Sequence, residues 1–419
     1  MTTFSSPSTT SGSQAQTKLE TVFDQAGITV NGSKAQDIQV HDPAFFAGVA
    51  KLHTQGIAEA YVRGQVSFRD QVAFWDHLLA PVPDRPGTIF AELLPVSTTL
   101  KTRLAKSKIK RAFHLINPFD IARKHYDIPP FLFLSFLGDT KAYTCGFFDF
   151  NEDPDPLSLE ALNTAQNRKL KYHADYLEIA DGKTILEIGP GWGSLANFLQ
   201  ENYPNTKFSY VGLNVSQNQI AHCREYFAND ERFEFVLQDF GEPLLTPSGK
   251  ARTFDGIVSL GMIKHCGRER QTEFFRAIRQ ASHLGSKVSL QIIVSRKYRE
   301  IAEPFLSEYI FPEADISPDE YYLGQFTAHR RFQLERYRRS SRHYAQTLKN
   351  WLRQFSLNWT ETEPPVEEYL HENPHPLCRS SQEMYRLFEA YFSLCVAGFN
   401  QREYSLTTLQ GIPTPGWKE

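Results

Sequence analysis

The chain has 419 residues, of which 41% are hydrophobic and 22% charged, a balance typical of a globular protein with room for two or three domains. Its formal net charge of -3 gives no reason to expect nucleic acid as a partner. Aromatic residues are the one excess, at 13%, and indicate either a Phe-rich core or an aromatic-lined pocket for an apolar or cationic species. Neither a disulfide framework nor a metal site is expected, because no CxxC pair or metal-ligand spacing occurs among Cys145, Cys223, Cys266, Cys378 and Cys395.

The N-terminal part of the chain reads as a tail followed by helices. Residues 1–20 are rich in Ser and Thr and carry no apolar segment, which excludes a secretory signal and predicts a disordered tail. Residues 21–115 are predicted to form a small helical domain. Within it, the stretch DPAFFAGVAKLHTQGIAEAYVRG starts at Asp42, a residue suited to an N-cap, and carries apolar residues at helical spacing. The Pro-rich stretch from Pro81 to Gly87 ends this first helical group.

The sequence contains two basic stretches, and each has two possible interpretations. The first carries six Lys or Arg residues between Lys101 and Arg111, and is either a solvated helix face or linker, or a contact for an anionic membrane surface. The second, Arg330 to His343, is either an exposed edge strand that leads into a helix, or a site for a phosphate or carboxylate. No apolar run reaches the roughly 18 residues of a membrane span, so we expect a cytoplasmic protein, with peripheral membrane contact and a homodimer left open.

From Lys183 onward, short β-rich runs alternate with amphipathic helical stretches. The runs are KTILEIG, FSYVGLNV, FEFVLQD, GIVSLG and KVSLQIIV, and the stretches between them include SLANFLQENY, SQNQIAHCREYF and RQTEFFRAIRQA. This order is typical of an α/β fold in which helices wind around a parallel sheet.

One glycine-rich turn carries the chemistry. The stretch ILEIGPGWGSLANFL places Gly189, Gly191 and Gly193 directly after a predicted strand and before a predicted helix, where the backbone can approach a ligand closely. The spacing is GxGxG rather than GxGxxG, the acid Glu187 precedes the first glycine, and the second strand ends in Asn214 rather than an acid. These details favour S-adenosylmethionine (SAM) over a dinucleotide, and a turn without a ligand is the alternative.

Several stretches together resemble the cyclopropane fatty acid synthase family, which includes the mycolic acid cyclopropane synthases. The similarity runs from about Asp37 to Leu409, and the residues that carry it are HDPAFFAGV…GIAEAYVRGQ, KHYDIPPFLFLSFLGDTKAYTCGFF, LEIGPGWGSLA, VGLNVSQNQIAHCR, VSLGMIKHCG, SEYIFPEADISP and RHYAQTLKNW. The resemblance implies a Rossmann-like class I SAM-dependent methyltransferase fold with a mostly parallel seven-stranded sheet. It also implies a catalytic domain with a substrate cap over residues 116–419, and SAM contacts from Tyr143, Thr144, Gly189, Gly191, Asn214, Gln219, Gln238 and Asp239.

The resemblance also implies a bicarbonate ion as base, held by a cysteine backbone, a glutamate, a histidine and a tyrosine. Cys145 and Tyr344 keep their positions, but Lys264 stands in place of the glutamate and Gln291 in place of the histidine. The usual bicarbonate site is therefore doubtful here, and Lys264, Tyr344 and His265 are the candidate bases, with a packing role as the alternative for His265.

Three interpretations of Lys264 stay open. Burial can lower its pKa so that the neutral amine takes a proton, or it can hold an anion, or it can pair with Glu303 or Glu313. We hypothesise a SAM-dependent C-methyltransferase that acts on an alkene or other electron-rich carbon of a lipid-like or specialised-metabolite substrate. The alternatives are a true cyclopropane fatty acid synthase, an inactive SAM-fold lipid-binding or scaffold protein, and, more distantly, a dinucleotide oxidoreductase.

Overall fold

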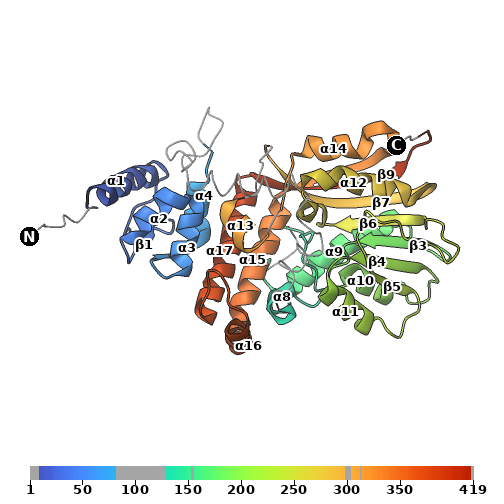
Figure 1. The fold of residues 1–419 in the computed structure, drawn as a ribbon, viewed down its shortest axis with the longest axis horizontal. Helices are drawn as coiled ribbons and strands as arrows, with labels where there is room; N and C mark the ends of the chain where they lie inside the picture. The colour runs from blue at the N-terminus through green and yellow to red at the C-terminus, as the bar shows by residue number, and fades with distance from the viewer. Residues whose placement is uncertain (1–8, 82–128, 152–154, 298–302, 312–313, 417–419) are drawn as a thin grey trace, which may run out of the picture.

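The structure is a computed structural model that describes residues 9–81, 129–151, 155–297, 303–311 and 314–416. Three parts follow one another across the molecule: the N-terminal helices, a middle group of helices, and a sheet with helices on both faces (Figure 1). The basic stretch from Lys101 to Arg111 lies outside the described residues, as do most of the Pro-rich stretch before it and residues 124–128.

The sheet has seven strands in the order β5-β4-β3-β6-β7-β9-β8. Strands β3 to β7 pair in parallel, and β9 runs antiparallel to both of its neighbours, β7 and β8. This arrangement confirms the predicted α/β fold with a mostly parallel seven-stranded sheet. The strands are β3 (Thr184–Ile188), β4 (Ser209–Asn214), β5 (Phe233–Leu237), β6 (Phe254–Leu260), β7 (Ser282–Ser295), β8 (Phe332–Ser340) and β9 (Tyr404–Pro413).

The five predicted β-rich runs correspond to β3 through β7. These strands are largely buried because helices cover both faces of the sheet, which is why their sequences are nearly continuous in apolar residues. Strand β8 lies at the edge of the sheet, carries four arginine or glutamate side chains and leads into helix α15 (Arg342–Leu357). The interpretation of the second basic stretch as an exposed edge strand before a helix is therefore confirmed.

Helices pack on both faces of the sheet. Helices α12 (Arg268–Gln280) and α14 (Asp319–Thr327) lie on one face, where Phe274, Phe275 and Phe326 join one hydrophobic cluster with the strands. Helices α9 (Leu159–Leu177), α10 (Ser194–Asn202) and α11 (Gln217–Tyr226) pack through a second cluster on the other face (Figure 1). Helices thus cover both faces of the sheet. A ligand can reach the sheet at the ends of its strands.

The N-terminal helices differ from the prediction in two places. Helix α1 (Thr9–Gln25) replaces most of the predicted tail over residues 1–20, because Leu19, Val22 and Phe23 lie at helical spacing and are buried in the core. The helix predicted from Asp42 is broken at His53, which has a positive φ of 57° and separates α2 (Ala44–Leu52) from α3 (Thr54–Val62).

The remaining N-terminal elements complete a small helical unit. They are β1 (Ile38–Val40), β2 (Val66–Phe68) and α4 (Gln71–Leu78), and the two strands pair antiparallel. At the start of α2 the Asp42 side chain accepts a hydrogen bond from the backbone N–H of Ala44 at 2.9 Å, in agreement with the predicted N-cap role, and Asp70 caps α4 through the N–H of Ala73.

The middle group consists of α8 (Pro130–Leu137), α13 (Pro304–Tyr309), α16 (Trp359–Glu372) and α17 (Ser381–Asn400), together with α15. One hydrophobic cluster runs without a break from the N-terminal helices into this group. The predicted boundary between residues 115 and 116 lies outside the described residues and stays a prediction. The apolar run FLFLSFL forms α8 and buries Leu132, Phe133 and Phe136 in the same cluster. Among the described residues, no helix combines the length and the hydropathy that crossing a membrane requires.

Candidate active site

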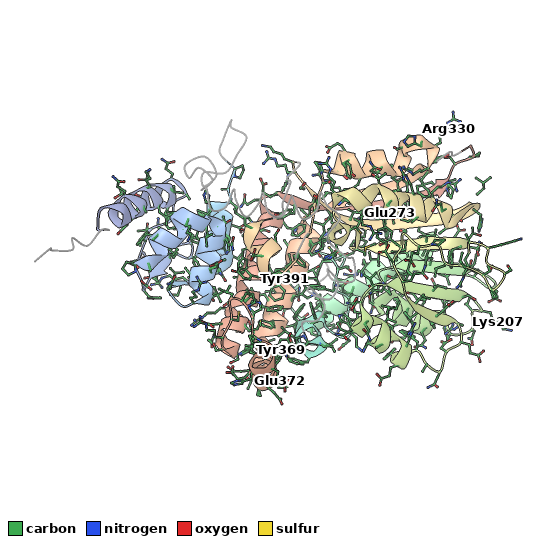
Figure 2. The ribbon with its side chains drawn as sticks, viewed as in Figure 1. Lys207, Glu273, Arg330, Tyr369, Glu372 and Tyr391 are labelled. Atoms are coloured by element: carbon green, nitrogen blue, oxygen red, sulfur yellow. The ribbon has the colours of Figure 1, made fainter. Side chains whose placement is uncertain are left out.

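A pocket opens at the carboxyl ends of strands β3, β4, β5 and β6, where ligands bind in open α/β sheets. It holds about 1610 Å³ of empty space, its open mouth included. The middle helices close the opposite side, with Tyr344 from α15 and Tyr391 from α17 in the lining. Figure 2 shows Tyr391 in the middle of the molecule, between the N-terminal helices and the sheet. The pocket is therefore built jointly by the sheet and the helical group.

The glycine turn after β3 forms the floor of the pocket. Gly189 has a positive φ of 82°, and an added Cβ would lie 2.8 Å from Cγ of Met262. Gly191 also has a positive φ, of 58°, but an added Cβ there would meet no atom within 4 Å. A side chain at Gly191 would thus project into open space beside the pocket, whereas the glycine leaves backbone that a ligand can approach.

Gly193 is not brought to the pocket. It is the N-cap of α10 with a φ of 83°, and an added Cβ would lie 3.0 Å from the ring of Phe227. Close packing at the start of the helix therefore explains why this position is a glycine, as it often does for the third glycine of such turns.

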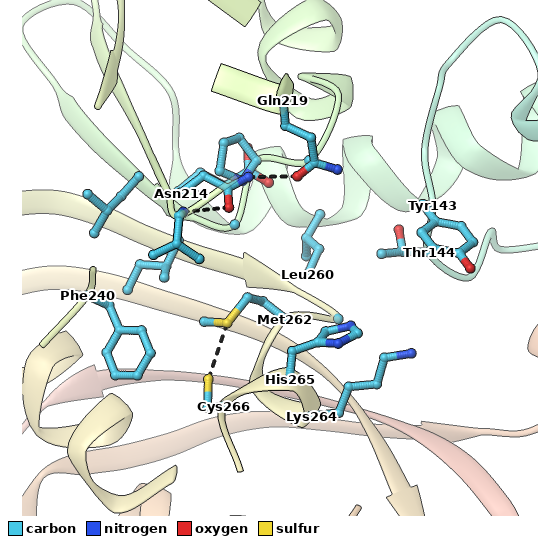
Figure 3. A pocket seen from close by; sticks show the side chains of 18 of the residues that line it. Tyr143, Thr144, Asn214, Gln219, Phe240, Leu260, Met262, Lys264, His265 and Cys266 are labelled. Carbon is cyan, nitrogen blue, oxygen red and sulfur yellow. Dashed lines mark hydrogen bonds between the residues drawn. The ribbon is translucent and has the colours of Figure 1, made fainter. Parts of the chain in front are cut away.

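Two side-chain amides are fixed beside the turn. Asn214 Nδ2 donates to Gln219 Oε1 at 2.8 Å, and Asn214 Oδ1 accepts from the backbone N–H of Val215 at 2.8 Å (Figure 3). The hydroxyl of Ser216 caps α11, which holds Gln219 in the first turn of that helix. The pair presents oriented amide groups of the kind that bond ribose hydroxyls.

The segment after β5 is held by an arginine. Arg270 donates to both carboxylate oxygens of Asp239, with Nη1 2.9 Å from Oδ2, and its guanidinium lies 4.5 Å from the centroid of the Phe240 ring. The side-chain amide of Gln238 donates to the backbone carbonyl of Glu242 at 2.8 Å. Both predicted contact residues line the pocket, but their side chains are engaged within the protein.

A buried carboxylate and a buried lysine lie near the turn, Glu187 at the pocket itself. Glu187 is 2% exposed, accepts a hydrogen bond from the hydroxyl of Tyr210, and has its pKa raised to about 7 by burial. Lys169 of α9 is fully buried, donates to Thr144 Oγ1 at 2.9 Å, and has its pKa lowered to about 8 by burial, an effect that the charge of Glu187 opposes. Sequence reasoning missed Lys169 and also the helix that carries it; a lysine among the apolar positions of Leu159–Leu177 would have been the signal.

Lys264 extends into the pocket from the short 3-10 helix η1 (Ile263–Cys266) after β6. It is 8% exposed, and its Nζ lies 3.8 Å from the centroid of the Phe311 ring. Burial lowers its pKa to about 8. In Figure 3 the side chain points toward the side of the pocket where Tyr143 and Thr144 lie.

No carboxylate forms a salt bridge with Lys264 in the part of the chain that the structure describes. The carboxylate of Glu303 instead accepts hydrogen bonds from Thr54 Oγ1 at 2.6 Å and from the N–H of Leu306 at 3.0 Å. The second predicted partner, Glu313, lies outside the described residues. The ammonium group therefore faces aromatic rings and the pocket.

Aromatic side chains line the wall around Lys264. The hydroxyls of Tyr143 and Tyr391 are 2.9 Å apart, and the ring of Tyr344 stacks on Phe399 with centroids 4.5 Å apart. His265 also lines the pocket and packs edge-on against Phe311, with ring centroids 5.9 Å apart. Tyr391 comes from a segment that the motifs did not single out, whereas Phe311 lies within the stretch SEYIFPEADISP but had no role assigned to it.

Two of the predicted site residues lie behind the pocket surface. Cys145 is fully buried with its Sγ 4.0 Å from Thr347 Oγ1, and burial raises the pKa of its thiol to about 12. Gln291 of β7 is 1% exposed, and neither atom of its side-chain amide has a hydrogen-bond partner among the described residues. Of the four positions implied for bicarbonate, only Tyr344 and Lys264 line the pocket with their side chains.

These features fit a sulfonium nucleoside. The open space at Gly191 leaves room for its amino-acid end, Glu187 lies where it can meet an ammonium group, and the amides of Asn214 and Gln219 match ribose hydroxyls.

Comparisons with known proteins agree with this fit. The family described as mycolic acid cyclopropane synthetase matches residues 114–409. The cyclopropane-fatty-acyl-phospholipid synthase of Escherichia coli K12 is 26% identical over 385 residues, which cover 92% of this chain and 90% of that protein. The tuberculostearic acid methyltransferase of Mycobacterium tuberculosis is 26% identical over 329 residues, covering 77% and 73%.

Solved structures show the same fold. The cyclopropane synthase MmaA2 of Mycobacterium tuberculosis has a TM-score of 0.57 at 24% identity, and the alignment covers 70% of this chain and 98% of that one. A coclaurine N-methyltransferase has a TM-score of 0.62 at 17% identity, covering 85% and 98%.

Fold, glycine turn and family match together define a SAM-dependent methyltransferase, with SAM as its cofactor. More narrowly, the chain belongs to the mycolic acid cyclopropane synthetase family, which confirms the resemblance found in the sequence. The individual contacts to the cofactor stay predictions.

Proposed function

We propose that the protein methylates an electron-rich carbon, in an alkene or an enol-like group, of an apolar lipid-like or specialised-metabolite acceptor. The observation that carries this proposal is the joining of two features in one cavity: a glycine turn suited to SAM and an aromatic wall that contains Lys264.

When bound, SAM supplies an electrophilic methyl group on a sulfonium. The residues that would hold it are Gly189 and Gly191 with Glu187 at the amino-acid end, Asn214 and Gln219 at the ribose, Gln238 and Asp239 near the adenine, and Tyr143 with Thr144 on the facing side.

The aromatic wall excludes water from the acceptor side and presents ring faces to positive charge. Phe311, Tyr344, Tyr391 and Trp192 all line the pocket and are each less than a tenth exposed. Such rings stabilise a cation by about 1–2 kcal/mol when desolvated, which suits both a sulfonium and an electron-deficient acceptor.

Lys264 changes the electrostatics of that wall. Two like charges about 4 Å apart cost roughly 4 kcal/mol at an effective dielectric of 20, so a protonated Lys264 opposes positive charge on the acceptor. Burial lowers the pKa of Lys264 to about 8, which makes the neutral amine available to take a proton. We propose that Lys264 is the base that takes the proton lost by the acceptor. Tyr344 and His265 are the other candidate bases in the pocket lining.

Bicarbonate is not part of the proposal. Two of the four positions that the family resemblance assigns to the ion have changed residue, and the amide of Gln291 lies behind the pocket surface.

Relatives are named for lipid acceptors, which supports an apolar acceptor for this chain. Besides the Escherichia coli synthase, the sphingolipid C9-methyltransferase 1 of Gibberella zeae is 29% identical over 246 residues, which cover 57% of this chain and 44% of that protein. Contact with a membrane surface belongs to the same proposal, because such acceptors partition into membranes.

The test is to incubate the full chain with SAM carrying a ¹³C-methyl group and with lipid and metabolite extracts, and then to solve the labelled product by NMR. We expect the label on a carbon as a methyl substituent. Label on nitrogen or oxygen, or no transfer by a protein that binds SAM, would contradict the proposal. Because the Escherichia coli relative covers nearly the whole chain, cyclopropane formation is the second candidate, and the high-field protons of a cyclopropane ring would identify it.

A further inference from the structure

We infer that the acceptor carries an acidic, enolisable head group, a 1,3-dicarbonyl or a phenol, whose anion pairs with Lys264 inside the pocket. This inference rests on the proposed function and names the substrate class of the same site.

The first observation is the set of groups around the Lys264 ammonium. Its Nζ lies over the Phe311 ring at 3.8 Å, and the titratable group that acts on it among the described residues is the thiol of Cys395 on α17. Burial raises the pKa of that thiol to about 12 and the pKa of Tyr391 well above its usual value, so both groups stay neutral. Among the described residues, this cation has an aromatic ring and neutral groups around it, and an anion that entered the pocket would stabilise it.

The second observation is the way the side chain points. Lys264 comes from the loop after β6 and is directed into the pocket, toward the side where Tyr143 and Thr144 lie and away from Asn214 and Phe240 (Figure 3). The ammonium therefore lies away from the proposed ribose site. We place the acceptor on this other side of the pocket.

The charge of the acceptor before and after methyl transfer decides which acceptor suits a pocket that contains a lysine ammonium. A neutral alkene that gains a methyl cation becomes positive, and this charge would lie beside the lysine ammonium. An enolate or phenolate that gains the same group becomes neutral, and beforehand it carries the negative charge that Lys264 can pair with. With an anionic acceptor, the lysine ammonium attracts the acceptor instead of repelling the positive charge that a neutral alkene would gain.

The proton step balances within the pocket. The neutral Nζ of Lys264 takes the proton of the acceptor hydroxyl, so that the O–H bond breaks, its electron pair stays on the oxygen, and a new N–H bond forms. The negative charge is shared with the carbon next to the oxygen-bearing carbon, which is the nucleophile. No further reactant is needed, and burial of Lys264 favours the neutral amine that begins the step.

The test measures binding to the full chain without SAM. The probe is 1-phenylbutane-1,3-dione, and the control ligand is 1-phenylbutan-1-one, which has the same apolar body but no acidic enol. We expect the dione to bind at least about tenfold more tightly than the ketone, and its bound form to show the ultraviolet absorbance of the enolate. In Lys264→Met both the preference and the enolate absorbance should be lost.

Lys141→Met is the matched control, because Lys141 lines the same pocket but its Nζ lies 4.9 Å from the Tyr226 ring. This variant should keep the preference for the dione. Equal binding of dione and ketone by the wild-type chain, or an unchanged preference in Lys264→Met, would overturn the inference.

Titration of S-adenosylhomocysteine into the same samples separates the two proposals. If it binds to all three proteins and the dione preference is absent, the inference fails and the methyltransferase proposal stands. If it does not bind to the wild-type chain, the methyltransferase proposal itself fails.

Discussion

The hydroxyl of Tyr309 donates a hydrogen bond to the carboxylate of Glu59 at 2.8 Å and so joins α13 to α3 of the N-terminal unit. Thr54, at the other end of α3, donates to Glu303, the residue that caps α13. Helix α3 therefore holds both ends of α13, and Phe311, two residues beyond Tyr309, carries the ring under Lys264. The N-terminal helices thus fix one wall of the pocket without lining it.

Removing these two contacts should loosen that wall. Thr54→Val combined with Tyr309→Phe leaves buried carboxylate oxygens without these donors, and we expect the free energy of unfolding to fall by about 2–4 kcal/mol. The methylation rate should fall as well. The control is Tyr226→Phe, which removes an exposed hydroxyl bonded to Asn197 and should change neither thermal denaturation nor rate. Unchanged stability and rate in the double variant would show that α3 does not support the site.

Burial of Lys264 should lower the free energy of unfolding, and the substitution Lys264→Met should raise it again. Burial lowers its pKa from 10.5 to about 8, so between these pH values the unfolded chain holds a proton that the folded chain has released. Stability therefore rises with pH across this window, and below pH 8 the lysine costs about 3 kcal/mol. We expect chemical denaturation to show a more stable Lys264→Met variant at pH 7 and a difference that shrinks toward pH 10. A variant less stable than the wild type at pH 7 would contradict the burial argument.

The methylation rate should depend on the same ionisation. With Lys264 as base, the rate at saturating SAM should rise with pH and level off above about 8, because only the neutral amine takes the proton. The groups that face it are Cys395 and Tyr391 from α17, whose pKa values are raised by burial, together with Tyr143 and Tyr344. Residual activity of Lys264→Met should lack this rise, and a variant that keeps it would place the base elsewhere.

Gly191→Val should abolish cofactor binding without unfolding the chain. The added side chain would project into the open space beside the turn, and we expect the affinity for S-adenosylhomocysteine to fall at least about a hundredfold by calorimetry. Gly182→Val is the control, because Gly182 also has a positive φ, of 76°, with no atom within 4 Å of an added Cβ, but does not line the pocket. Similar losses of affinity in both variants would point to backbone strain instead.

Lys169→Met should weaken cofactor binding through Glu187 and Thr144. Without the buried ammonium, Glu187 loses the charge that lowers its pKa, and Thr144 loses its hydrogen-bond donor. We expect affinity for S-adenosylhomocysteine to fall by about tenfold. The loss should be largest just above pH 7, where Glu187 is ionised in the wild type but protonated in the variant, and smaller below pH 7, where Glu187 is protonated in both. A loss that is the same at every pH would indicate a packing defect.

The central strands could be predicted because both of their faces are buried. Runs such as KTILEIG and GIVSLG are rich in Ile, Leu and Val and lie between amphipathic helices, so local sequence and tertiary structure agree. The break at His53 had no such signal. It depends on the close packing of Gly48 and Gly56, where an added Cβ on Gly56 would lie 2.6 Å from the carbonyl oxygen of Gly48, and this contact exists only once α2 and α3 have packed.

The candidate site was predictable only in part for the same reason. The residues of the glycine turn are close in sequence, so their spacing carries the signal. Phe311, Tyr391 and Lys169 reach the site from three separate segments, and only the packing of α13, α17 and α9 brings them together. The burial of the Gln291 amide behind the pocket likewise follows from the position of β7 in the middle of the sheet.

A crystal structure of the full chain with S-adenosylhomocysteine tests the central claim most directly. We predict the homocysteine end against Gly189 and Gly191, the ribose beside Asn214, and the sulfur turned toward the aromatic wall that holds Lys264. A nucleoside bound outside this pocket, or a sulfur that faces away from Lys264, would contradict the account.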